Sequence, residues 1–394
     1  MRILLVHNYY QQAGGEGQVF KAEANLLEAH GHQVLQYTLH NDQLAPVGPL
    51  TTAVKTIWNR QVYQTLHDLI QQENIQIVHF HNTFPLISPA AYYAAKAAGA
   101  AVVQTLHNYR LLCPNALFFR DEKPCEDCLG KSIPWPGIVH KCYRDSLVAS
   151  GGVATLLSVH RLMKTWANAV DAYIALSPFA KEKLIEGGIP SDKIKIKPNF
   201  IDPDPGYQPQ PGQYALFVGR LSPEKGIDTL LSAWAELGQS IPLKIVGDGP
   251  LANKVAEAAA DSSGIEWLGR CPMEEVYQHM KSALFLVFPS RWYEGLPRTI
   301  IESFAVGTPV LASDLGVMSS IVKSGYSGWH FQAGSAPHLI QVVERLLSDP
   351  QALKKIRKTT RQSFDDSYSA AKNYEQLIEI YQSVDKPSLS PALL

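Results

Sequence analysis

The chain has 394 residues, of which 46% are hydrophobic and 18% charged, with a formal net charge of −1, which suits a soluble globular protein of about two domains. The charge balance gives no case for nucleic-acid binding, no run of about 18 apolar residues predicts a transmembrane helix, and five cysteines in so long a chain do not indicate a disulfide framework. Residues 1–6 are too few for a signal peptide and indicate a first strand, so we expect a cytoplasmic protein.

Strand-like and helix-like segments alternate through the first half of the chain. The predicted strands are 3–6, 33–37, 75–80, 101–106, 172–175 and 194–196. The predicted helices are 16–30, 54–71, 89–98 and 177–186. This alternation predicts a parallel, doubly wound α/β sheet, in which ligands bind at the carboxyl ends of the strands.

The first strand leads into a glycine-rich loop over residues 7–17. Gly15 and Gly17 begin a dinucleotide fingerprint, but Phe20 takes its third glycine position, and the second strand ends without a carboxylate for a ribose. A nicotinamide site is therefore disfavoured. Two interpretations stay open: Gly14 and Gly15 let backbone N–H groups approach a phosphate, or the loop is a plain turn.

Histidines stand at the ends of the next two strands. His79 and His81 belong to the third strand, and His107 follows the fourth. A lone histidine is more often structural than catalytic, but the carboxyl end of a parallel strand is where ligands bind, so both roles stay open.

An insertion over residues 110–145 interrupts the alternation and contains Cys113, Cys125, Cys128 and Cys142. Cys125 and Cys128 have the C-x2-C spacing of a zinc half-site, and four thiolates would complete a structural, non-catalytic zinc tetrahedron that clips the loop. Because the outer spacings are irregular, four reduced thiols are the slightly favoured alternative.

The helical segment over residues 147–169 follows, with several leucines beside Arg161 and Lys164. We expect a helix that faces the core. A helix lying on a membrane surface is the alternative, which would give peripheral contact at the inner face of the membrane.

A linker over residues 203–212 holds four prolines and two glycines. It separates a predicted domain over residues 1–202, which includes the insertion, from a second domain over 213–366. The second domain repeats the alternation, with predicted strands at 214–218, 243–246, 265–267, 284–288 and 309–312.

The first strand of the second domain ends in Gly219-Arg220, and Lys225 and Gly226 follow shortly afterwards. A bidentate guanidinium and a mobile ammonium suit a diphosphate that no metal neutralises, at about 1.5 to 3 kcal/mol for each charged hydrogen bond. The next two strands end in close-approach loops that contain Asp248 and Arg270.

The strand at 284–288 leads to Glu294-Gly295-Leu296-Pro297-Arg298-Thr299 and on to Glu302. Gly295 would make a tight turn and Pro297 would lie in the first turn of a helix that stops at Gly307. Backbone N–H groups near Leu296 would then bind a phosphate. Glu294 and Glu302 would be roughly 12 Å apart, beyond the separation of a glycosidase pair, and could hold opposite ends of an extended ligand.

Together, the Gly14-Gly15 loop, His107, Gly219-Arg220-Leu221, Glu224-Lys225-Gly226 and the two glutamates around Gly-Leu-Pro resemble family 4 retaining glycosyltransferases, also described as glycosyl transferases group 1. The resemblance covers nearly the whole chain apart from the insertion and the last residues. It implies the GT-B fold, with two doubly wound Rossmann-like domains facing each other across a cleft. It also implies a terminal helix, residues 367–385, that crosses back to the N-terminal domain, and an insertion that shapes acceptor choice.

By this resemblance we expect transfer of a sugar, with retention, from a nucleotide diphosphate sugar to a sugar or lipid-linked acceptor, in polysaccharide or glycolipid synthesis. No catalytic metal or other cofactor is implied, and no protein nucleophile. Asn108 stands where the family commonly has Asp, which puts in doubt any role needing a charge there. The implied catalytic residues are His107, Arg220, Lys225 and Glu294. The implied donor-binding residues are Gly14, Gly15, Gly219, Asp248, Arg270, Gly295, Leu296, Pro297, Thr299 and Glu302.

Two rival functions stay open. A nucleotide-sugar epimerase of the same fold would need a carboxylate base in the first domain, where the strand ends offer only histidines. A non-catalytic nucleotide-sugar-binding subunit would keep Arg220, Lys225 and Glu294 for binding alone. The base, the sugar and the acceptor are not determined by these patterns.

Overall fold

The structure is a computed structural model that describes residues 1–11, 14–44 and 49–385. It divides into two compact units. The first contains Met1–Ala116, Glu126–Lys197 and the residues from Asn373 onward, and the second contains Leu117–Cys125 and Pro198–Lys372. The insertion predicted to belong wholly to the first domain is therefore shared between the units.

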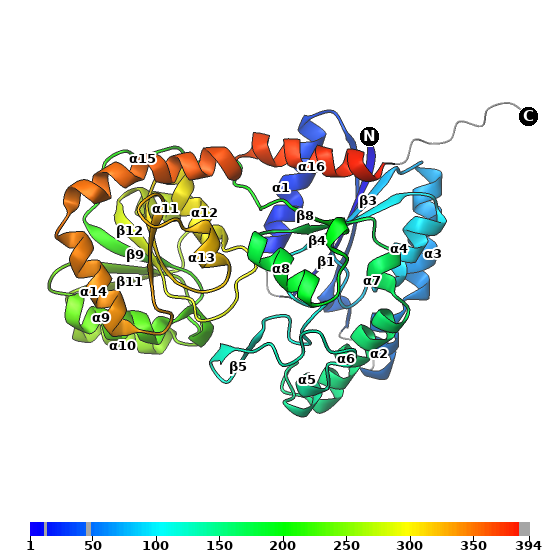
Figure 1. The fold of residues 1–394 in the computed structure, drawn as a ribbon, viewed down its shortest axis with the longest axis horizontal. Helices are drawn as coiled ribbons and strands as arrows, with labels where there is room; N and C mark the ends of the chain where they lie inside the picture. The colour runs from blue at the N-terminus through cyan, green and yellow to red at the C-terminus, as the bar shows by residue number, and fades with distance from the viewer. Residues whose placement is uncertain (12–13, 45–48, 386–394) are drawn as a thin grey trace, which may run out of the picture. The chain divides into compact units, whose positions relative to one another are not determined.

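The first unit is built on a six-stranded parallel sheet in the order β2-β1-β3-β4-β7-β8 (Figure 1). Its strands are β1 Arg2–Tyr9, β2 Gln33–His40, β3 Ile77–Asn82, β4 Ala101–Leu106, β7 Ala172–Ala175 and β8 Ile194–Ile196. The helices in this part of the chain are α1 Gly15–Ala29, α2 Pro49–Ile57, α3 Arg60–Gln72, α4 Ala90–Ala97, α5 Trp135–Val139, α6 Leu147–Leu162, α7 Thr165–Asn168, α8 Pro178–Glu186 and α16 Ala370–Val384. Two short 3-10 turns, η1 Asn41–Leu44 and η2 Ser191–Lys193, complete it.

One core of the first unit joins helices from the two ends of the chain. Phe20 and Leu27 of α1 pack with Leu377 and Tyr381 of α16, against strand residues such as Ile77. All five side chains are fully buried. The apolar face of the terminal helix is therefore buried on the sheet of the first unit.

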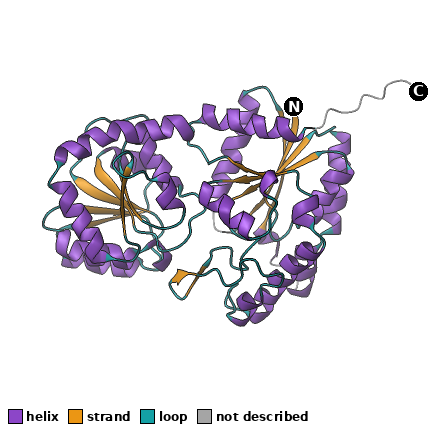
Figure 2. Cartoon of the chain, viewed as in Figure 1, coloured by secondary structure: helices purple, strands orange, loops and turns teal. Residues whose placement is uncertain are grey.

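The second unit has its own six-stranded parallel sheet in the order β11-β10-β9-β12-β13-β14, surrounded by helices (Figure 2). Its strands are β9 Tyr214–Val218, β10 Leu243–Val246, β11 Ile265–Gly269, β12 Ala283–Phe288, β13 Val310–Ser313 and β14 Gly328–Phe331. Its helices are α9 Ile227–Leu237, α10 Ala252–Asp261, α11 Met273–Lys281, α12 Arg298–Val306, α13 Val317–Ile321, α14 Ala336–Leu347 and α15 Pro350–Ser367, with the 3-10 turn η3 Pro223–Lys225. A hairpin of β5 Phe119–Arg120 and β6 Lys123–Pro124 comes from the insertion.

The predicted doubly wound sheets are confirmed, and the differences concern helix boundaries and one strand. The predicted helix 54–71 is two helices, because the side chain of Asn59 accepts the backbone N–H of Val62 and starts α3 afresh. Pro297 is the N-cap of α12 and not part of its first turn, whereas Gly307 ends that helix as predicted, in the left-handed conformation. The sequence patterns missed strand β14 altogether. Among the described helices, none is long and apolar enough to cross a membrane.

Gly226 is the glycine on which the loop after β9 most depends. It has a φ of 74°, and a Cβ atom there would lie 1.9 Å from the carbonyl oxygen of Pro289. Only glycine therefore lets this loop pass so close to the end of β12.

We predict that Gly226→Ala lowers the free energy of unfolding by about 1 to 3 kcal/mol more than Gly31→Ala does. Gly31 is the matched control, because its φ of 80° is equally unfavourable for alanine but a Cβ there meets nothing within 4 Å. Urea denaturation of both variants measures the difference. Equal losses would show that the contact with Pro289 is not limiting.

Candidate active site

In the second unit, the candidate site lies where the strand order reverses, between β9 and β12. Doubly wound sheets bind ligands at the carboxyl ends of the strands beside such a switch point. Lys225 follows β9 and Glu294 follows β12, and their Nζ and Oε1 atoms are 2.7 Å apart. Two residues far apart in sequence thus form an ion pair at the switch point.

The carboxylate of Glu294 is 5% exposed and is held by several donors. Besides Lys225, the Ser290 hydroxyl donates to Oε1 at 2.8 Å and the Trp292 indole N–H donates at 2.7 Å. The Lys225 ammonium also lies 5.3 Å from the centre of the Trp292 ring. Because a buried charge is costly unless paired and hydrogen-bonded, this arrangement holds both side chains in one geometry.

The N-terminus of α12 lies directly beyond Glu294. Its N-cap, Pro297, offers no side-chain hydrogen bond, so the first backbone N–H groups of the helix lack a side-chain cap. Thr299 is half-buried in this first turn. An uncapped helix N-terminus next to a lysine is suited to binding an anion.

Glu302 lies one turn further along α12 and is 6% exposed. Its carboxylate forms an ion pair with Arg298 at 3.3 Å. Burial raises the pKa of Glu302, and the nearby Arg298 opposes that shift.

The remaining predicted donor residues of this unit lie around the neighbouring strand ends. Gly219 lies against Gly247. A Cβ atom on Gly247 would lie 1.9 Å from the Gly219 carbonyl oxygen. Asp248 and Arg270 form an exposed ion pair at 3.2 Å. Arg220 is exposed to solvent. Thus Lys225 and Glu294 are in direct contact, while Arg220 has no ion pair within the described part of the chain.

In the first unit, the strand order reverses between β1 and β3. Gly14 is the N-cap of α1 and has no side-chain cap, and Gly15 is the first residue of that helix. In the same first turn, Glu16 accepts a hydrogen bond from the Asn82 side chain at 3.3 Å. Burial raises the pKa of Glu16 to about 7, against the opposing effect of Arg110.

Glu16 corrects the prediction that only histidines stand at the strand ends of the first unit. The sequence does contain a signal for it, since it directly follows the two loop glycines. What the sequence could not show is that Asn82, at the end of β3, comes within hydrogen-bond distance of it.

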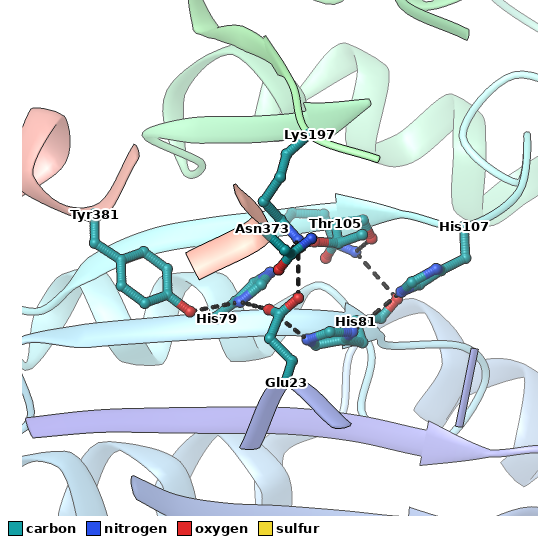
Figure 3. A network of polar contacts seen from close by, with 9 residues as sticks. Glu23, His79, His81, Thr105, His107, Lys197, Asn373 and Tyr381 are labelled. Carbon is teal, nitrogen blue, oxygen red and sulfur yellow. Dashed lines mark hydrogen bonds and ion pairs between the residues drawn. The ribbon is translucent and has the colours of Figure 1, made fainter. Parts of the chain in front are cut away.

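His107 is half-buried beyond the end of β4, and its Nε2 atom lies 3.0 Å from Nδ1 of His81. Burial, together with the neighbouring His81, holds the pKa of His107 well below its usual value. His79 and His81 are buried on β3 and contact a buried carboxylate from α1 (Figure 3). The three histidines predicted from the strand ends are therefore brought together, and all lie within the first unit.

The zinc site suggested for Cys113, Cys125, Cys128 and Cys142 is not supported. In the described residues, the one group of three side chains with ligand atoms within 4.8 Å of one another is Glu23, His79 and His81. The Cys113 thiol instead donates to the Asn115 side chain at 2.9 Å, and that of Cys128 to the Pro134 carbonyl at 3.8 Å.

Two family models match the chain: Glycosyltransferase Family 4 over residues 13–205 and Glycosyl transferases group 1 over residues 204–363. A glycosyltransferase from Methanocaldococcus jannaschii is 28% identical, over 54% of this chain and 60% of the relative. The amylovoran biosynthesis glycosyltransferase AmsK of Erwinia amylovora is 26% identical, over 54% of this chain and 56% of the relative. The chain thus spans less than two thirds of the length of these curated relatives.

Among solved structures, the HepE protein of Anabaena in complex with UDP superposes with a TM-score of 0.68 at 18% identity, over 97% of this chain and 100% of that one. This likeness defines the fold as GT-B. With the two family models covering both units in turn, the chain belongs to the group 1, family 4 glycosyltransferases.

The raised pKa of Glu16 yields a pH-dependent prediction. Because its folded pKa of about 7 lies above the ordinary 4.5, its contribution to stability is present at low pH and is lost as the pH rises through about 7. We expect Glu16→Gln to reduce the fall in the free energy of unfolding between pH 5 and pH 8, measured by urea denaturation. Glu28→Gln, an exposed position on the same helix, is the control. An identical fall in wild type and Glu16→Gln would contradict the prediction.

Proposed function

We propose that this protein is a retaining, metal-independent glycosyltransferase that moves a sugar from a nucleotide diphosphate sugar to an acceptor hydroxyl, in polysaccharide or glycolipid synthesis. The observation that carries the proposal is the Lys225–Glu294 pair of 2.7 Å at the switch point of the second unit, beside the uncapped N-terminus of α12. A cation and a helix N-terminus at one strand edge are what a diphosphate requires.

In the proposed reaction, the bond between the anomeric carbon and the diphosphate oxygen breaks as the acceptor oxygen bonds to the same face of that carbon. The acceptor proton passes to an oxygen of the departing phosphate. Lys225, Arg220 and the first N–H groups of α12 stabilise the negative charge that develops on the diphosphate. Glu294 holds Lys225 and orients the sugar hydroxyls, Glu302 holds the ribose, and His107 contacts the sugar.

Metal independence is supported by the cationic groups around the predicted diphosphate site. The chain contains one Asp-x-Asp sequence, Asp202-Pro203-Asp204. The Asp204 carboxylate is held by the Arg361 guanidinium, with Nη1 to Oδ1 at 2.9 Å. This aspartate is thus already neutralised by an arginine, which makes it a poor metal ligand.

The nucleobase and the acceptor are proposed from two similar proteins. The UDP in the HepE structure makes uridine diphosphate sugars the first donors to test. The role of AmsK in amylovoran biosynthesis supports a polysaccharide or its lipid-linked precursor as acceptor.

The outer face of α6 supports peripheral contact with a membrane. Val148 and Leu162, near its two ends, are 79% and 86% exposed. Arg144 and Lys164, which flank the helix, are exposed as well. Apolar side chains with cations at both ends suit an anionic lipid surface.

We predict that Val148→Glu/Leu162→Glu weakens co-sedimentation of the protein with vesicles containing an anionic phospholipid. Ile185→Glu, which changes an exposed apolar side chain on α8, is the control. Equal binding by wild type and both variants would argue against the α6 surface as the contact.

We predict that wild type, kept in EDTA, turns over one donor from a panel of UDP, GDP and ADP sugars, and that Glu294→Gln lowers kcat by about 100-fold or more. NMR of the anomeric proton tests retention. Glu266→Gln, which removes an exposed ion pair of 3.0 Å with Lys244 in the same unit, should leave kcat unchanged.

Other outcomes point to the rival functions. Donor binding without turnover, with acceptors present, would favour a nucleotide-sugar-binding subunit. Rearrangement of the donor without an acceptor, abolished by Glu16→Gln, would favour an epimerase, because Glu16 supplies the carboxylate that such an enzyme needs in the first unit. Loss of turnover in EDTA would contradict metal independence.

A further inference from the structure

A buried ion pair lies beneath the histidines of the first unit. Lys197 and Glu23 are at most 1% exposed, and the Lys197 ammonium lies 3.0 Å from Oε2 of Glu23. The same ammonium donates to Oδ1 of Asn373 at 3.2 Å. Burial by itself raises the pKa of Glu23, but Lys197 and the histidines together hold it well below its ordinary value. Glu23 is therefore a carboxylate and not a proton donor.

The second oxygen of Glu23 faces two histidines (Figure 3). Oε1 lies 3.1 Å from Nδ1 of His79 and 3.5 Å from Nε2 of His81. Within the described residues, Glu23 Oε1 and His81 Nε2 are both buried atoms without a well-formed hydrogen bond. A proton on His81 Nε2 is thus stabilised by the carboxylate, whereas a lone pair there would face a negative charge.

The position of this proton decides the hydrogen bond to His107. With a single ring proton, placed on Nε2, His81 has a lone pair on Nδ1. That lone pair accepts the Nε2–H of His107 across 3.0 Å. Because the pKa of the half-buried His107 is held well below its usual value, its ring carries one proton, and its remaining nitrogen, Nδ1, then has a lone pair.

A metal ion is the competing explanation of this cluster, because Glu23, His79 and His81 offer three close ligand atoms. Two contacts oppose it. The Lys197 ammonium already neutralises the carboxylate, so a divalent cation would leave excess positive charge in a buried place. Nδ1 of His79 also lies 2.7 Å from the Tyr381 hydroxyl.

We propose that Glu23 is a positioning residue that sets the tautomer of His81 and thereby makes Nδ1 of His107 a hydrogen-bond acceptor for a hydroxyl of the bound sugar. The contact with sugar rests on the proposed function, whereas the tautomer does not. Lys197 keeps Glu23 ionised, and His79, between Tyr381 and Thr105, packs beside His81.

The tautomers are measured by long-range proton–nitrogen NMR of the full-length protein, with His81→Asn and His107→Asn used to assign signals among the 13 histidines. In wild type we expect His107 protonated at Nε2 and unprotonated at Nδ1. In Glu23→Gln/Lys197→Met, which leaves no lone buried charge, we expect a mixture of His107 tautomers. We expect kcat of this variant to fall roughly 10- to 100-fold, which is the usual effect of losing a partner that orients a functional imidazole. The KM for the donor should stay near that of wild type.

The matched control is Lys96→Met/Asp171→Asn, which removes a partly buried ion pair of 2.8 Å in the same unit. It should change neither the tautomers nor kcat. A proton on His107 Nδ1 in wild type would overturn the proposal, even if the Glu23 variant does not fold. So would an unchanged His107 tautomer in the folded variant, or one equivalent of metal bound to the purified protein. Absence of transfer with the expected tautomers would contradict the proposed function and the sugar contact, but not the positioning of His107.

Discussion

A carboxylate removed from water must be neutralised where it stands, and each unit of this protein meets that requirement with a lysine distant in sequence. Glu23 is paired with Lys197 in the first unit, and Glu294 with Lys225 in the second. Loss of either partner would leave a buried charge, which typically costs about 3 to 5 kcal/mol. The two pairs therefore fix the side chains around them.

The two pairs differ in what they leave accessible. The Lys225 side chain is 21% exposed, so its ammonium can reach a ligand while Glu294 holds it. The Glu23–Lys197 pair is fully enclosed and can act only through the groups it touches, of which the histidines lead towards the half-buried His107. The Lys225–Glu294 pair is suited to binding a diphosphate, and the Glu23–Lys197 pair is suited to orienting a neighbouring side chain.

The enclosed pair also lies where the chain passes between the units. Lys197 is the last residue before the chain enters the second unit, and Asn373 is the first after it returns. The Lys197 ammonium donates to Asn373, and Tyr381 of α16 contacts His79. Both connections are thus joined through the Lys197 ammonium, which pairs with the buried Glu23 carboxylate and donates to Asn373.

The sequence by itself determined the two doubly wound sheets, because apolar strands alternate with helices. It also predicted Lys225, Glu294 and His107 as site residues from their places after strand ends, and their role in the reaction stays a prediction. It did not reveal the short strand β14 or the contact between Glu16 and Asn82, which depend on neighbours elsewhere in the chain. It also missed the break at Asn59, although the capping contact with Val62 is local. It also left four cysteines as a candidate zinc site, which the described residues do not support. Only the tertiary structure decided which charges meet, because a pair such as Glu23 and Lys197 is brought within 3.0 Å by packing across a sheet and not by any local pattern.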